Sequence, residues 1–145
     1  MSMTFFPEMS PIIGSAFACG HGHSSHRLPH PEAVQLLADE VRAGRPGVLS
    51  ECGQEECATA PVSIVAIESD PGPHAQMSGT NAALLLRTLG LPEGLGGSEQ
   101  AEVFLSLVEA AQALAQDGSY EGRRLEDLHD VAVFAVNRGR KVCWA

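Results

Sequence analysis

Two short segments rich in cysteine and histidine constrain this chain more than any other part of its sequence. The first runs from Cys19 to His26 (Cys-Gly-His-Gly-His-Ser-Ser-His), and the second from Cys52 to Cys57 (Cys-Gly-Gln-Glu-Glu-Cys). Together they hold three of the four cysteines and three of the six histidines. Structural zinc is bound by thiolates and imidazoles, commonly with two ligands from each of two turns. The sequence therefore predicts a metal site that joins two loops far apart in the chain.

The predicted zinc ligands are Cys19, His21 or His23, Cys52 and Cys57. Their spacings, Cys-x-His and Cys-x4-Cys, differ from the Cys-x2-Cys knuckle of many zinc sites. The fourth cysteine, Cys143, is predicted to lie outside the site. The alternative interpretation is two ordinary loops with reduced or buried thiols, since a domain of 145 residues can fold without a metal.

Composition favours one compact, globular and acidic domain. Hydrophobic residues make up 44% of the chain and charged residues 19%, and the net charge is −9. An acidic surface repels phosphate, so we expect no nucleic-acid partner. No apolar run is long enough to span a membrane, and no basic residue precedes Arg27, as a secretory signal would require. These features predict a cytoplasmic protein whose cysteines are thiols or metal ligands.

The first half of the chain, residues 1–75, predicts a strand-helix-strand unit. Pro11–Ala18 and Val62–Ile67 have the short apolar and β-branched character of strands. Pro31–Ala43 predicts a helix that buries Val34 and Val41 and ends at a glycine. We expect a right-handed crossover between the strands, whereas residues 1–10 predict only a lead-in or a frayed end.

The second half, residues 76–145, predicts a mainly helical part with a short terminal strand. Its helices are expected at 81–89, from a Ser98 cap to about 116, and at 125–138, before a strand at 141–145 that contains Trp144. The predicted fold class is α+β in a single domain over residues 1–145, with a small sheet of about three strands and four helices in total. The consecutive residues Leu84, Leu85 and Leu86 cannot all face one side of a helix. One of them is therefore a candidate either for a contact in a homo-oligomer or for coverage by the N-terminal segment.

The segment His21-Gly-His23-Ser-Ser25-His26 resembles the His-x-His-x-Asp-His motif of the metallo-β-lactamase superfamily. That resemblance implies a small metal-dependent hydrolase in which bound metal activates a water molecule. Ser25 stands where the family has a metal-binding aspartate, which argues against a two-metal site.

A second resemblance rests on the segment from Asn81 to Leu91 and on the terminal Arg-Lys-Val-Cys-Trp-Ala. These stretches look like uncharacterised small proteins of actinobacteria and their bacteriophages, and eight arginines against one lysine fit a GC-rich genome. The resemblance implies an accessory protein in a host cytoplasm and carries no site residues.

No complete catalytic set is present, so the sequence favours a non-enzymatic protein. The predicted function is a protein-interaction or accessory module, pinned by structural zinc, that binds a protein partner or itself. The alternatives are the hydrolase that uses the His21–His26 loop and a subunit of a larger homo-oligomer.

Overall fold

The structure is a computed structural model that describes all residues from Met1 to Ala145. It is an α+β fold with four α-helices and two small antiparallel sheets. The chain divides into two compact units, one formed by residues 1–9 together with 72–145 and the other by Ser10–Pro71. The second unit is thus an insertion between the first two strands of the first.

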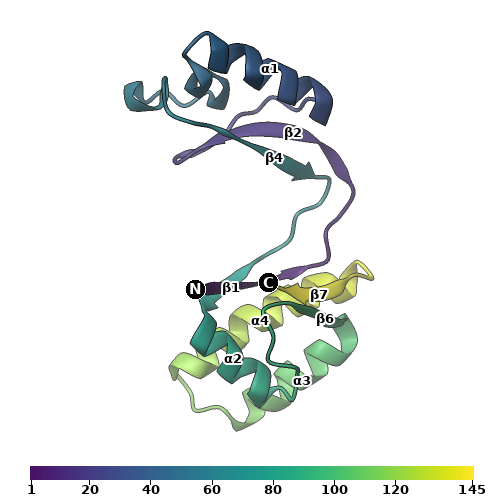
Figure 1. Cartoon of the computed structure of the whole chain (residues 1–145). Coiled ribbons are helices and arrows are strands. Elements are labelled where there is room, and N and C mark those ends of the chain that lie inside the picture. Colours follow the sequence, from purple (N-terminus) through teal and green to yellow (C-terminus); the bar gives the residue numbers. More distant parts are fainter. The chain divides into compact units, whose positions relative to one another are not determined.

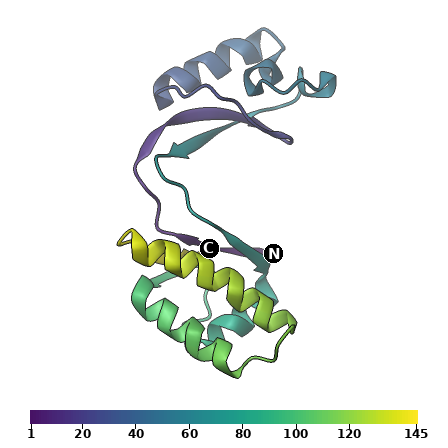
Figure 2. The same ribbon diagram turned by 180° about the vertical axis from the view of Figure 1, so that it is seen from behind.

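The unit formed by residues 1–9 and 72–145 contains a four-stranded sheet in the order β5-β1-β7-β6. Its elements are β1 (Ser2–Pro7), β5 (Ala75–Ser78), α2 (Gly79–Thr88), β6 (Gly97–Gln100), α3 (Ala101–Leu114), α4 (Tyr120–Asn137) and β7 (Lys141–Trp144). The three helices pack against the strands, and α3 and α4 lie side by side, as Figures 1 and 2 show from opposite sides.

Burial explains why the N-terminal segment is a strand and not the predicted lead-in. β1 pairs with both β5 and β7, and its alternating side chains Met3 and Phe5 are buried. The rings of Phe5, Phe104 and Trp144 lie with centroids 6.2–6.3 Å apart. The predicted terminal strand is confirmed, and its Trp144 side chain is buried.

The helices of this unit begin and end close to the predicted residues, with two corrections. The Ser78 hydroxyl accepts a hydrogen bond from the Asn81 N–H and caps α2. Ser98, however, lies in β6 and caps no helix, because the segment pairs with β7 before α3 begins. α4 starts five residues earlier than predicted, where Ser119 accepts from the Gly122 N–H at 3.0 Å. Leu85 and Leu86 are buried, whereas Leu84 is exposed.

The Ser10–Pro71 unit contains the three-stranded sheet β3-β2-β4, one α-helix and two 3-10 turns. Its elements are β2 (Ile12–Cys19), β3 (Gly22–His23), α1 (His30–Arg42), η1 (Pro46–Ser50), η2 (Glu55–Cys57) and β4 (Ser63–Glu68). α1 contacts β2 and η1, and Figure 1 shows it beside the two long strands.

The order strand-helix-strand is present in this unit, but the predicted right-handed crossover is wrong. β2 and β4 are antiparallel, with Ala18 opposite Ser63 and Ile12 opposite Glu68. The long connection through α1, η1 and η2 returns the chain to the end of β2 at which it left. The single sheet of about three strands is likewise corrected to sheets of four and three strands.

α1 buries less than its pattern predicts. Ala33 is its only fully buried residue, and Val34 and Val41 are exposed. None of the four helices has the length and apolar character needed to cross a membrane.

Candidate metal centre

Three cysteines and one histidine of the Ser10–Pro71 unit come together at one end of the β2–β4 ladder. The ligand atoms of Cys19, His21, Cys52 and Cys57 all lie within 4.8 Å of one another. The Nδ1 atom of His21 is 3.1 Å from Sγ of Cys57 and 3.7 Å from Sγ of Cys52. All four cysteines of the chain are free thiols.

A tight hairpin turn supplies the first two donors. Cys19 ends β2 and pairs with Gly22 in β3, so that only Gly20 and His21 form the turn between the strands. The His21 backbone N–H points at Sγ of Cys19, 3.4 Å away. Gly22 has φ = +148°, a conformation that side chains disfavour, which lets the chain reverse immediately after His21. The unusual Cys-x-His spacing is thus the spacing of a two-residue β-turn.

The two 3-10 turns supply the other donors. Cys52 follows η1, and Cys57 is the last residue of η2. Glu51, between η1 and Cys52, has a left-handed backbone (φ = +56°), which is uncommon for a residue other than glycine. This reversal redirects the chain so that Cys52 and Cys57 both reach His21.

A glycine without an obvious role in the sequence allows the two turns to approach. The Gly47 N–H donates to the Ala58 carbonyl at 3.1 Å. A Cβ atom at position 47 would lie 1.3 Å from the carbonyl oxygen of Cys57, so that no side chain fits there. The Pro46-Gly47 dipeptide signals a turn, but nothing in the sequence indicates that this turn packs on a metal ligand.

The thiols differ in their tendency to lose a proton. Hydrogen bonds from the His21 backbone N–H and from the Ser50 side chain lower the pKa of Cys19 to about 6. Burial raises the pKa of Cys57 to about 11, and its hydrogen bonds with Cys52 and Cys19 act in the same direction. These opposite shifts favour the thiolate form of Cys19 and the protonated form of Cys57, and binding of a cation would expel thiol protons.

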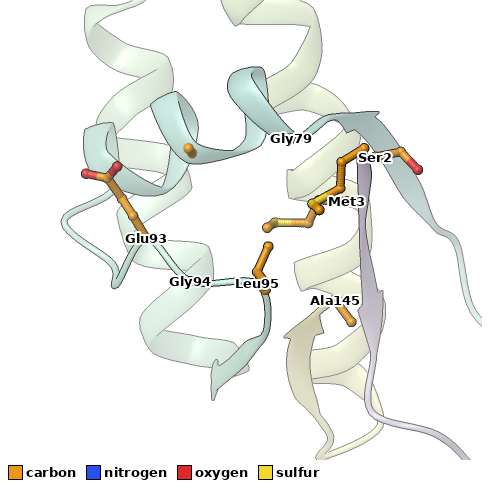
Figure 3. Close-up of a pocket in the computed structure, with 9 residues that line it drawn as sticks. Ser2, Met3, Gly79, Glu93, Gly94, Leu95 and Ala145 are labelled. Carbon is orange, nitrogen blue, oxygen red and sulfur yellow. The ribbon is translucent and has the colours of Figure 1, made fainter.

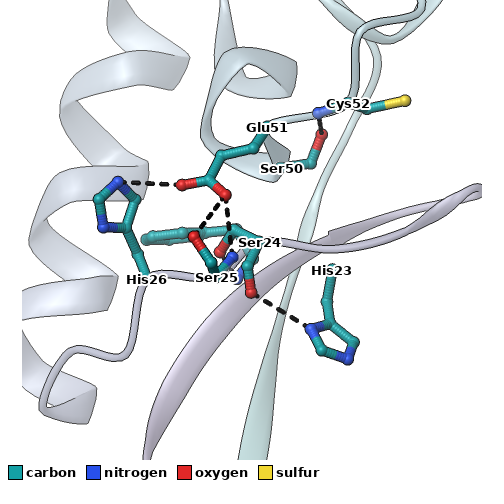
Figure 4. Close-up of polar contacts among 8 residues, drawn as sticks. His23, Ser24, Ser25, His26, Ser50, Glu51 and Cys52 are labelled. Atoms are coloured by element: carbon teal, nitrogen blue, oxygen red, sulfur yellow. Dashed lines mark hydrogen bonds and ion pairs between the residues drawn. The ribbon is translucent and has the colours of Figure 1, made fainter.

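Glu51 fastens the two loops to each other (Figure 4). Its Oε2 atom accepts from the backbone N–H of Ser25 at 2.9 Å and from the Ser25 hydroxyl at 2.8 Å, while Oε1 lies 3.0 Å from Nε2 of His26. The Ser25 N–H and hydroxyl, and then the nearby His26, lower the pKa of Glu51. In the sequence Glu51 resembles any solvated acidic residue; its role emerges only once the loops are placed together.

The remaining histidines of the predicted loop lie outside the cluster. Nδ1 of His23 is 3.2 Å from the carbonyl oxygen of Ser24, and the His23 side chain is exposed. His26 pairs with Glu51. The structure thus selects His21 over His23 as the fourth donor, and it separates the three imidazoles that a hydrolase would need together. Cys143 lies on β7, in the other unit, as expected for a cysteine outside the site.

The largest concavity of the other unit has no comparable chemistry. It has a volume of about 470 Å³ and is lined mainly by Met1, Met3, Ala83, Leu95 and backbone (Figure 3). Its one charged lining residue, Glu93, is already paired with Arg87 at 2.7 Å. The other polar side chain of this concavity is that of Ser2, and no histidine or cysteine is among the lining residues.

Comparisons with protein-family models, with curated proteins and with solved structures gave no match. What the Cys3His cluster can bind therefore follows from its own donors.

Proposed function

We propose that this protein is a non-enzymatic interaction or accessory module whose Ser10–Pro71 unit is held together by one structural zinc ion. The observation that carries the proposal is the convergence of three thiols and one imidazole within 4.8 Å. Sulfur-rich donor sets favour zinc over magnesium, calcium or manganese, which prefer oxygen.

The distances support tetrahedral binding. With Zn–S bonds of about 2.3 Å and a Zn–N bond of about 2.0–2.1 Å, the donors of a tetrahedral site stand roughly 3.5–3.8 Å apart. The distances of 3.1 and 3.7 Å from His21 lie near this range, and the limit of 4.8 Å for the whole set requires only small adjustments. Protein donors would fill all four positions, which is the pattern of a structural site; a catalytic site keeps a position for water.

The same geometry disfavours the alternative of a metal-dependent hydrolase. Such an enzyme needs an open coordination position and a group that manages protons beside it. His26, which the hydrolase interpretation requires, is paired with Glu51 at 3.0 Å instead of facing the cluster. We therefore place the hydrolase second.

Two further features support protein binding as the role. Both units expose large apolar side chains, among them Ile12, Val48, Leu84, Leu95 and Leu114. Exposed apolar side chains contribute to an interaction site where they adjoin one another on the surface. The net charge of −9 opposes binding to nucleic acid. The resemblance to small actinobacterial and phage proteins supports an accessory role in a host cytoplasm.

Metal analysis of matched variants tests the proposal. We expect one zinc per chain in the unaltered protein, loss of zinc and of thermal stability in Cys52→Ser, and retention of both in His26→Ala. Cys143→Ser serves as the control for removing a thiol outside the site. A catalytic centre would show the opposite order, with a hydrolytic activity lost in His26→Ala. Capture of a specific host protein by the zinc-loaded chain tests the interaction role.

A further inference from the structure

Strand β4 is an edge strand whose outer backbone has no partner. In the order β3-β2-β4 it pairs only with β2, and Figure 1 shows it beside that strand. Alternate residues of an edge strand direct both their N–H and C=O groups outward. Such a row of donors and acceptors is a template for another strand.

The other free edges of the two sheets are protected, and β4 is not. Proteins protect edges by keeping them short or by placing charges and prolines on them. β3 has two residues, while β5 and β6 have four each and are half polar or more (Ala-Gln-Met-Ser and Gly-Ser-Glu-Gln). β4 has six residues, Ser-Ile-Val-Ala-Ile-Glu, with four apolar residues in a row and no proline or lysine.

The single charge of β4 is held away from the free edge. Oε2 of Glu68 accepts from the backbone N–H of Ser10 at 2.8 Å and from its hydroxyl at 2.9 Å. Ser10 shortly precedes β2, the strand on the inner side of β4, and Ile12 at the start of β2 pairs with Glu68. The carboxylate is therefore drawn towards β2, where it does not guard the outer edge.

We propose that β4 pairs antiparallel with β4 of a second copy across a two-fold axis, so that the two three-stranded sheets become continuous. This proposal rests on the proposed interaction role and names its partner. With the axis at Ala66, this residue faces Ala66 of the other copy, and Val65 faces Ile67, because residues opposite one another in an antiparallel pair share a face of the sheet. Apolar residues thus meet apolar residues at the centre of the ladder, and Ile64 faces Glu68 at each end.

Electrostatic repulsion between the two β4 strands is expected to be small. In this register the two Glu68 side chains stand four residues apart along the ladder, about 14 Å at ~3.4 Å per residue. That exceeds the Debye length of about 8 Å at physiological ionic strength. Because both copies are acidic overall, we expect added salt to strengthen the association, whereas it would weaken binding to a basic partner.

The test is the mass of the full, zinc-loaded chain by sedimentation equilibrium, at several concentrations and two salt concentrations. We expect a monomer–dimer equilibrium, at least tenfold weaker in Ala66→Lys, because Ala66 is exposed in one copy and two lysines would meet at the axis. The control, Ser98→Lys, adds the same charge to the β6 edge and should leave the dimer unchanged. Zinc content, expected to be equal in all three proteins, verifies the fold.

A monomer at every concentration, or a dimer unaffected by Ala66→Lys, overturns the proposal. The proposal is also overturned if the wild-type chain stays monomeric but captures a foreign protein that the Ala66→Lys variant does not capture. That result would leave the interaction role intact. A stably folded chain without zinc instead overturns the metal part of the proposed function, whatever its mass.

Discussion

The unit formed by residues 1–9 and 72–145 buries nineteen apolar side chains in one cluster, whereas the Ser10–Pro71 unit buries four apolar residues. Those four are Ala16, Phe17, Ala33 and the candidate ligand Cys57. Four serines are buried in the chain, and all of them belong to the smaller unit. One unit thus has an ordinary hydrophobic core, and the other has polar groups, small side chains and a Cys3His cluster where a core would be.

The difference gives a physical reason for the proposed metal site in a chain long enough to do without one. A segment the size of Ser10–Pro71 is near the limit at which apolar burial alone stabilises a fold, and small domains of this kind commonly add a metal or disulfides. In zinc-finger peptides, metal binding supplies about 10–16 kcal/mol of apparent free energy. The length of the whole chain is therefore the wrong measure; the relevant length is that of the inserted unit.

Metal removal should produce the largest difference in stability between the two units. With a strong chelator, or in Cys57→Ser, we expect the amides of Ser10–Pro71 to lose their protection from hydrogen exchange while those of β1, α3 and α4 keep theirs. The larger unit should survive because unfolding the insertion only loosens a loop between β1 and β5, and each doubling of loop length costs about 0.6 kcal/mol. Residue-resolved exchange measures both units in one sample.

Cys143→Ser is the control, since it removes a thiol from the larger unit. The claim that only the inserted unit depends on metal is wrong if chelation leaves that unit protected, or if both units lose protection together.

The reverse experiment acts on the hydrophobic core. Phe104 is fully buried and lies against Phe5 and Trp144, with ring centroids 6.3 Å away in each case. Phe104→Ala should lower the free energy of unfolding of the larger unit by about 3–5 kcal/mol, with zinc content unchanged under conditions where the chain remains folded. Urea denaturation followed by Trp144 fluorescence measures the loss. Leu114→Ala, at a side chain that is 89% exposed, should change the free energy of unfolding by less than about 0.5 kcal/mol.

A smaller but more specific effect is expected from one methyl group beside the metal cluster. Gly47→Ala would place Cβ 1.3 Å from the carbonyl oxygen of Cys57, so the η2 turn must shift and carry a ligand out of place. We expect weaker zinc binding in a competition titration with a chromogenic chelator, and a larger unit of unchanged stability. Gly53→Ala is the matched control, because no atom lies within 4 Å of its added Cβ. Equal zinc affinities in the two variants would show that η1 and η2 do not position the ligands.

Much of the larger unit follows from local patterns in the sequence. α3 repeats its apolar residues with helical period, Ser78 and Gly90 mark the limits of α2, and the terminal strand is short and apolar. β1, β5 and β6 were not foreseen. These strands are four to six residues long and owe their conformation to pairing with partners 41 to 139 residues away, which a local pattern does not contain.

In the smaller unit the cluster of candidate ligands was predictable, and the path of the chain that brings them together was not. The expected parallel crossover would have put the end of β2 and the start of β4 at opposite ends of the sheet, and Cys19 far from Cys57. The antiparallel pairing brings these ends together. Residue types and two clusters of donors were enough to predict Cys19, Cys52 and Cys57, whereas the choice of His21 over His23 depends on a two-residue turn visible only in the fold.

The smallest effect concerns Glu51, the carboxylate that ties the two ligand loops. Its pKa is lowered in the folded chain by the Ser25 N–H and hydroxyl and by His26. The stabilisation it gives is therefore complete above the ordinary carboxyl pKa and disappears as pH falls through the lowered folded value. At neutral pH, Glu51→Gln should destabilise the inserted unit, and the difference from the unaltered protein should vanish in acid.

Denaturation of both proteins in parallel at each pH, with zinc in fixed excess, separates this effect from protonation of the thiols, because the thiols are common to both. Glu93→Gln is the matched control: Arg87 lowers the pKa of Glu93 in the same way, but in the larger unit. Its effect should appear only in the amides of residues 72–145. If Glu51→Gln and Glu93→Gln destabilised the same unit, the two units would not be stabilised separately, one by the proposed metal site and the other by its apolar core.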